Sequence, residues 1–178
     1  MYHAPRFATA AVAVFAALVV SAASITGAAP ANAQPAPPSS TTMTCGSANP
    51  LLWAPPFTWN IRASSGASRP PGGVLEPAIL LGGGTELPGL PASLFPIFGI
   101  NWYGTRVLVD WHNQTTGTTG HSVSDEAVLR PSPDIPINRT WTGVGTVSFT
   151  VTVQTGAGWW FINTQTAVCR GTISVHPV

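Results

Sequence analysis

The sequence predicts an all-β fold in which two sheets pack face to face. Several segments alternate apolar and polar residues with a period of two, which is typical of strands that bury one face. Clusters rich in Gly, Pro, Thr and Asn separate these segments and predict turns. Beyond the N-terminal apolar segment, no stretch combines a helix start signal with a period of 3.6 residues. These observations favour about six or seven short strands.

Residues 1–33 are predicted to be a signal peptide that is removed on export. Arg6 and the free amine precede an apolar run of mostly Ala, Val, Leu and Phe at residues 7–25. Residues 31–33 (Ala-Asn-Ala) offer the small side chains that signal peptidase accepts, so we expect cleavage directly before Gln34. The alternative is a retained membrane anchor, since the run approaches the roughly 20 residues that span hydrocarbon. We favour cleavage, because the run is weakly hydrophobic for a span.

Residues 34–42 are rich in Pro, Ala, Ser and Thr, and they predict a flexible leader before a β-sandwich domain over residues 43–178. That domain carries no net charge: Arg6 is one of seven basic residues, and without it the arginines balance the six acidic residues. A neutral domain lacks the basic surface that nucleic acid or an anionic membrane selects. We therefore expect no nucleic acid partner, and no membrane contact after cleavage.

The first strands are expected around residues 43–48, 58–63 and 106–112, each of which alternates apolar with polar side chains. Residues 115–120 contain only Thr and Gly and predict a turn. Residues 121–124 are expected to pair back across that turn.

The clearest strand is residues 144–154, where Val or Phe alternates with Thr, Ser or Gln. Residues 156–158 (Gly-Ala-Gly) predict a hairpin turn, and the return begins at Trp159. Whether residues 159–176 form one bent strand or two stays open. The alternation near the C-terminus points Cys169 inward.

Residues 69–99 are predicted to be a long ordered excursion over the sheets. They contain Pro70, Pro71 and the triple glycine 82–84, so neither a helix nor a strand ladder is expected to persist. Loops of this length are uncommon and often functional. The interpretation that we slightly favour is a plug whose apolar residues fill the core.

The two cysteines, Cys45 and Cys169, are predicted to form a disulfide between the first strand and the last. They bracket nearly the whole domain, and an even count in an exported chain favours a bridge over two free thiols. In the chain-entropy model, closing so long a loop stabilises the fold by about 4 to 5 kcal/mol.

An immunoglobulin-like sandwich is the commonest solution for strands of this number and spacing. The Cys-Trp-Cys spacing of true immunoglobulin domains is absent, because Cys45 and Cys169 lie near the two ends of the domain. The chain has an export signal and no lysine, and it is rich in Ala, Gly and Pro. In architecture it resembles the short exported β-sandwich proteins of actinobacteria, many of which have no assigned function. That resemblance implies an extracellular or envelope location and no particular ligand.

Tryptophan is the main candidate for a binding residue. Core packing is expected for five of the seven: Trp53, Trp59, Trp102, Trp111 and Trp141. Trp159 and Trp160 are adjacent, and neighbouring strand residues point to opposite faces, so one of the two is expected outside or under a loop. Either one, with Trp102 and Tyr103, could stack on a sugar ring in a carbohydrate- or cell-wall-binding module.

A weaker pattern is Asp110 and His112 on one strand face with His121 across the turn. Three such ligands could meet at a Zn or Cu ion, or serve a hydrolase. Polar residues on an exposed strand face need no such explanation, and no phosphate loop or serine-hydrolase elbow accompanies them. The sequence names no cofactor.

The sequence therefore predicts location and fold more firmly than function. We expect a non-enzymatic, secreted or envelope-associated protein that acts by binding or as a structural surface component. Its partner is unknown, with cell-wall glycan or another envelope protein as candidates. The carbohydrate-binding module and the metal-dependent or hydrolytic enzyme are the alternatives.

Overall fold

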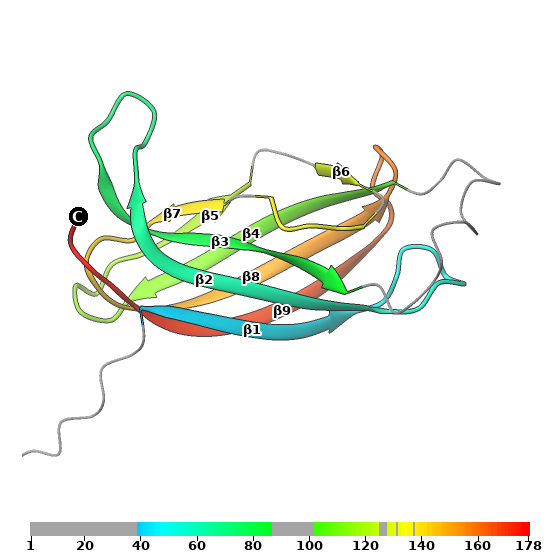
Figure 1. Ribbon diagram of the computed structural model, residues 1–178, viewed down its shortest axis with the longest axis horizontal. Helices are drawn as coiled ribbons and strands as arrows, with labels where there is room; N and C mark the ends of the chain where they lie inside the picture. The colour runs from blue at the N-terminus through cyan, green and yellow to red at the C-terminus, as the bar shows by residue number, and fades with distance from the viewer. Residues whose placement is uncertain (1–38, 87–101, 125–127, 131, 137) are drawn as a thin grey trace, which may run out of the picture. The chain divides into compact units, whose positions relative to one another are not determined.

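The computed structural model describes residues 39–86, 102–124, 128–130, 132–136 and 138–178, all within the second of two compact units, residues 35–178. In this part of the chain the strands form two antiparallel sheets without a helix (Figure 1). The predicted all-β, two-sheet fold is confirmed. The main path of each sheet has four strands, more in total than the predicted six or seven. No helix of the described residues is long and apolar enough to cross a membrane.

The first sheet has the strand order β1-β2-β3-β7. Its strands are β1 (Ser40–Ser47), β2 (Phe57–Ser68), β3 (Glu76–Glu86) and β7 (Asn138–Trp141). β1 starts earlier than predicted, so residues 40–42 of the expected leader are strand residues paired with β2. The predicted signal peptide and residues 34–38 of the leader lie outside the described residues.

The second sheet has the order β5-β4-β8-β9, and β6 pairs with the start of β4. Its strands are β4 (Tyr103–Asn113), β5 (Thr119–Val123), β6 (Val128–Arg130), β8 (Gly145–Ala157) and β9 (Ile162–Val175). The predicted pairing across residues 115–120 and the β8–β9 hairpin are both confirmed. β9 is a single strand, which answers the question of one strand or two, and its pairing with β8 shifts register between Thr155 and Ala157 of β8.

The prediction that residues 69–99 hold no ladder is wrong, because β3 pairs with β2 along its whole length. Gly83 explains how the triple glycine stays in a strand: its φ is 129°, and a Cβ there would lie 2.1 Å from the carbonyl oxygen of Asn60. On the other side, the amide of Ile135 donates to the carbonyl oxygen of Gly83 at 2.8 Å. The glycine-rich backbone is therefore paired on both sides. Residues 87–99 of the predicted excursion lie outside the described residues.

The core lies between the inner faces of the two sheets. Residues from both sheets are fully buried there, among them Trp59, Ile61, Val107, Val109, Val147, Val151 and Ile173. The predicted inward position of Cys169 is confirmed, since 3% of its surface is exposed. Alternate side chains of each strand point into this shared buried layer, which explains why apolar residues recur at every second position of the sequence.

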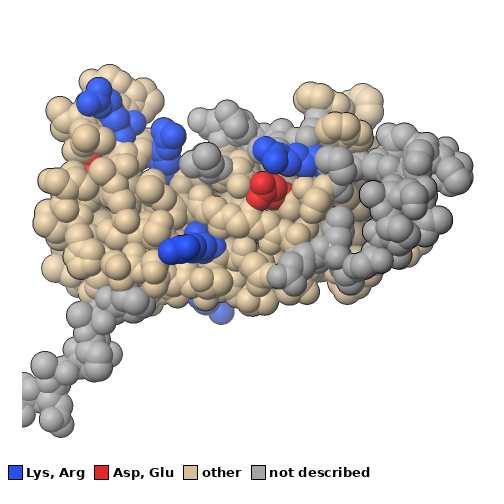
Figure 2. Space-filling model, viewed as in Figure 1, with Lys and Arg blue, Asp and Glu red and all other residues tan. Residues whose placement is uncertain are grey.

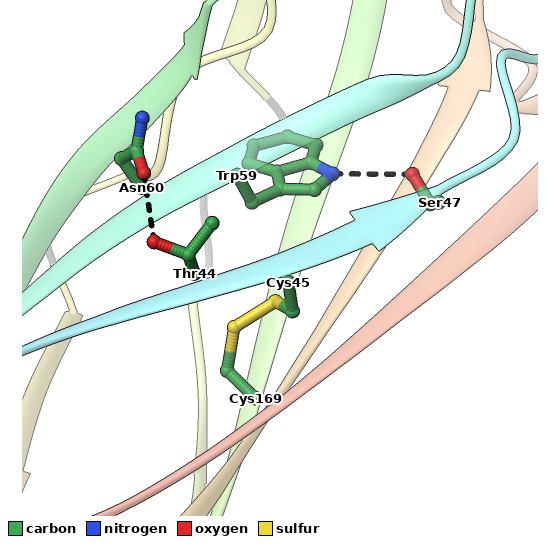
Figure 3. The surroundings of a disulfide bond; sticks show 6 residues. All are labelled: Thr44, Cys45, Ser47, Trp59, Asn60 and Cys169. Carbon is green, nitrogen blue, oxygen red and sulfur yellow. Dashed lines mark hydrogen bonds between the residues drawn. A yellow bond between two sulfur atoms is a disulfide. The ribbon is translucent and has the colours of Figure 1, made fainter.

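The two edges of the sandwich are fastened by different chemistry. At one edge the predicted disulfide joins Cys45 of β1 to Cys169 of β9, with their Cα atoms 5.6 Å apart (Figure 3). At the other edge the hydroxyl of Ser122 in β5 donates to the amide oxygen of Asn138 in β7 at 2.9 Å. Each edge strand of one sheet is therefore tied to an edge strand of the other.

Candidate functional site

Four of the seven tryptophans are exposed at one end of the sandwich. The exposed fractions are 71% for Trp53, 50% for Trp102, 76% for Trp159 and 83% for Trp160, and two aliphatic side chains join them, Leu52 at 87% and Ile162 at 60%. We call these six side chains the aromatic end: Leu52, Trp53, Trp102, Trp159, Trp160 and Ile162. They come from the β1–β2 loop, the residue before β4, and the β8–β9 turn with the first residue of β9, which lie together in Figure 1.

The β8–β9 turn projects both of its tryptophans. The prediction that Trp159 and Trp160 belong to the return strand is wrong, because Ala157 pairs with Ile162 and leaves residues 158–161 in the turn. The alternation argument does not apply to turn residues, so both indoles are exposed rather than one. Within the described part of the chain, positive φ angles at non-glycine residues occur at Phe161 (48°) and Asn163 (51°), in and beside this turn.

Phe161 anchors the turn while the tryptophans point away. It lies over a cross-strand glycine pair, Gly104 of β4 and Gly156 of β8. A Cβ would lie 2.7 Å from the ring of Phe161 if built on Gly104, and 2.3 Å from its Cα if built on Gly156. The guanidinium of Arg106 lies 5.8 Å from the centroid of the same ring. Only glycine at both positions lets the turn fold back this closely.

Two hydrogen bonds hold the three segments of the aromatic end together. The side-chain amide of Asn163 donates to the carbonyl oxygen of Pro50 in the β1–β2 loop at 2.6 Å. The backbone amide of Gly158 donates to the carbonyl oxygen of Trp102 at 2.6 Å. The aromatic end is therefore one fixed surface rather than three independent loops.

Tyr103, predicted to lie on the binding surface beside Trp102, is buried, with 4% of its surface exposed. Its ring packs edge to face on Phe57, with centroids 5.2 Å apart. Its hydroxyl donates to the amide oxygen of Asn49 at 3.3 Å, and the same oxygen accepts from the amide of Leu51 at 2.9 Å. Burial raises the pKa of the Tyr103 hydroxyl. Tyr103 thus supports the β1–β2 loop from beneath.

Sequence analysis missed the exposure of Trp53, which was assigned to the core. Trp102 was grouped with the core tryptophans but was also named as a candidate binding residue, and half of its surface is exposed. The assignment is right for Trp59, which is fully buried, while Trp111 and Trp141 are half-buried. A usable signal existed at Trp53, since residues 50–56 have prolines at both ends. Prolines donate no ladder hydrogen bond, so an apolar run between them indicates a loop rather than a buried strand.

Polar side chains next to the aromatic end form hydrogen bonds within the protein. Thr164 donates to the carbonyl oxygen of Phe161 at 2.7 Å, and the amide of Gln165 donates to the carbonyl oxygen of Asn163 at 3.1 Å. The β1–β2 loop (48–56) and the β8–β9 turn region (157–166) contain no Asp, Glu, Arg, Lys or His. The surface presented by these segments is uncharged and mostly apolar.

Asp110, His112 and His121 do not form the predicted ligand group. Asp110 lies opposite His121 across β4 and β5, whereas His112 lies opposite Thr119. Within the described ranges, no three His, Cys, Asp or Glu side chains are close enough to hold a metal ion. The metal hypothesis therefore loses its geometric basis.

The outer face of the second sheet has an open hollow of about 540 Å³, lined in part by Asp110, His112, Thr150 and Arg170. Of these side chains Asp110, His112 and Arg170 are exposed and Thr150 is half-buried. This is the ordinary condition of a solvated strand face. Figure 2 likewise shows basic and acidic side chains scattered over the visible face without a continuous patch of either sign. The hollow is thus a weaker candidate than the aromatic end.

Comparison with known proteins assigns this chain to no family. No protein-family model, curated protein or solved structure matches it. The argument about function therefore rests on the geometry of the aromatic end.

Proposed function

We propose that this protein is an exported β-sandwich protein that acts by binding rather than by catalysis, with the aromatic end as its contact surface. The observation that carries the proposal is the grouping of six large apolar side chains on three neighbouring segments that are bonded to one another. Single exposed apolar residues are normal on protein surfaces, whereas a contiguous group favours an interaction site.

Backbone strain in and beside the β8–β9 turn supports the same proposal. A bulky residue such as Phe161 at φ 48° costs on the order of 1 kcal/mol or more. Such strain clusters at functional sites, where it fixes a geometry that function requires. Here it accompanies the outward projection of Trp159 and Trp160.

The hydrogen bonds from Asn163 to Pro50 and from Gly158 to Trp102 also favour binding. Association is weakened when loops must be ordered as the partner arrives. A surface that is already fixed avoids most of that cost.

Export to the bacterial envelope or the medium, as the resemblance to actinobacterial proteins implies, is part of the proposal. The disulfide between Cys45 and Cys169 is compatible with an oxidising compartment. Intact mass of protein recovered after export tests this directly: we expect a chain that starts at Gln34 and is two hydrogens lighter than its reduced form. An uncleaved mass or two free thiols would contradict export with cleavage. Stoichiometric metal in the same sample would restore the enzyme hypothesis.

Binding is tested with tryptophan fluorescence of the exported protein during titration with purified cell-wall glycan and, separately, with phospholipid vesicles. We expect a saturable change with at least one probe that is absent in the variant W159A/W160A. The matched control is V74A/L75A, because Val74 and Leu75 are also exposed but lie in the β2–β3 hairpin at the other end of the sandwich (Figure 1). A response that W159A/W160A retains, or no response to either probe in a protein that also does not self-associate, would overturn the proposal.

A further inference from the structure

We infer that the partner of the aromatic end is the apolar boundary of a lipid layer of low net charge, into which its indoles and aliphatic side chains insert. This inference rests on the proposed function, because it requires the aromatic end to be the contact surface. It names the chemistry of the partner, which the proposed function leaves open.

The aliphatic members of the aromatic end favour lipid over sugar. Leu52 and Ile162 are among the exposed side chains, at 87% and 60%, and neither has a ring face on which a sugar could stack. Acyl chains, in contrast, accept aliphatic and aromatic side chains alike. Tryptophan is moreover enriched where membrane meets water, because its indole is apolar with one polar N–H group.

The hydrogen-bonding groups around the turn favour the same partner. A sugar site needs polar side chains that are directed at the ligand's hydroxyls. Here Asn163, Thr164 and Gln165 each donate to a backbone carbonyl oxygen of the protein itself. Asn49 does the same beneath the β1–β2 loop, where its amide donates to Pro55 at 3.0 Å. These bonds direct a donor of each polar side chain into the protein, whereas the apolar side chains of the aromatic end stay exposed.

The absence of charge defines which lipid layer fits. The β1–β2 loop and the β8–β9 turn region carry no charged residue, and the sequence beyond the predicted cleavage site is neutral. Neutrality removes electrostatic recruitment to an anionic surface, which is why the sequence predicts no membrane contact. It does not oppose apolar insertion, whose driving force depends on buried area rather than charge. Binding driven in this way is expected to be insensitive to salt.

The test is flotation of the exported protein, with its mass first confirmed, on phosphatidylcholine vesicles. We expect binding that is unchanged from low to high salt, and tryptophan emission that is quenched by lipids brominated on their acyl chains. W159A/W160A should bind at least about 30-fold more weakly, since two large apolar side chains no longer insert. V74A/L75A should bind like the unmodified protein.

Each outcome bears on one of the two proposals. If vesicles do not bind but W159A/W160A abolishes binding to cell-wall glycan, the lipid inference is wrong and the proposed function stands. A dimer that W159A/W160A dissociates, without vesicle binding, would likewise replace lipid by a second copy of the chain. If vesicles, glycan and self-association all fail, the proposed function fails together with the inference.

Discussion

Asn163 in β9 donates its side-chain amide to the backbone carbonyl oxygen of Pro50 at 2.6 Å, across 113 positions of sequence. Asn163 also holds a positive φ of 51°, which asparagine tolerates better than most residues. One side chain therefore sets the backbone of the hairpin and ties it to the β1–β2 loop.

The two roles of Asn163 can be separated by substitution. N163A loses the bond to Pro50 and places alanine at positive φ, so we expect a loss of about 1 to 3 kcal/mol in the free energy of unfolding. N163G loses the bond but accepts the backbone angle, and should lose less. Urea denaturation measures both. Equal stability of N163A and the unmodified protein would show that the bond from Asn163 to Pro50 does not stabilise the contact between β9 and the β1–β2 loop.

Gly156 is expected to be intolerant of any side chain. In G156A the new Cβ would lie 2.3 Å from the Cα of Phe161, a backbone atom that can yield only if the turn moves. We expect a loss of about 3 kcal/mol in unfolding free energy and a changed environment of Trp159 and Trp160. G82A is the matched control, since a Cβ on Gly82 meets nothing within 4 Å. If both variants unfold at the same denaturant concentration, the account of the glycine pair is wrong.

Loss of the Cys45–Cys169 bridge should lower stability by about 4 kcal/mol, because the loop that it closes spans 124 positions. The double variant C45A/C169A and the reduced protein should have similar unfolding midpoints in guanidinium, both well below that of the oxidised protein. A midpoint that does not respond to reductant would mean that packing between the sheets holds β1 against β9 without the bridge.

Because the Tyr103 hydroxyl is buried, we expect the folded protein to lose stability in alkali. Burial raises its pKa above the ordinary value of 10.0, so the folded state holds the phenolic proton more tightly than the unfolded state. The stability that this proton binding contributes is complete below pH 10 and declines as the pH rises through the folded-state pKa.

The chain makes this measurement simple, because it has two tyrosines and the other, Tyr2, lies in the predicted signal peptide. Phenolate absorbance of the exported protein should therefore titrate as one group with a midpoint above 10. Y103F should lose stability less steeply above pH 10 than the unmodified protein. A midpoint at or below 10, with the protein still folded, would contradict burial of this hydroxyl.

The sequence predicted those strands in which apolar and polar side chains alternate and whose neighbouring strands alternate in the same way. β8 is the clearest case, because Val147, Val151 and Val153 all face the core and a period of two is visible without knowledge of the fold. β3 escaped prediction because its glycines are held by distant partners, β2 on one side and residues 133–135 on the other. Nothing within residues 76–86 reveals those partners.

The candidate site was predicted in part, for the same physical reason. Trp102, Trp159 and Trp160 were identified as candidates, but the length of the β8–β9 turn depends on Phe161 packing over Gly104, which belongs to β4. The neighbouring residues alone therefore led to the wrong assignment of Trp159 and Trp160 to the return strand. Tyr103 shows the converse error: it follows exposed Trp102 directly but points into the core.

The central claim is that the aromatic end is the surface through which this protein meets its partner. The most direct measurement is photocrosslinking in the producing cell, with a photoreactive residue placed at Ile162, at Leu52 or at Val74 in separate variants. The account predicts the same crosslinked partner from Ile162 and Leu52, and none from Val74 at the other end of the sandwich. Crosslinks that are equally strong from Val74, or absent from both Ile162 and Leu52, would contradict it.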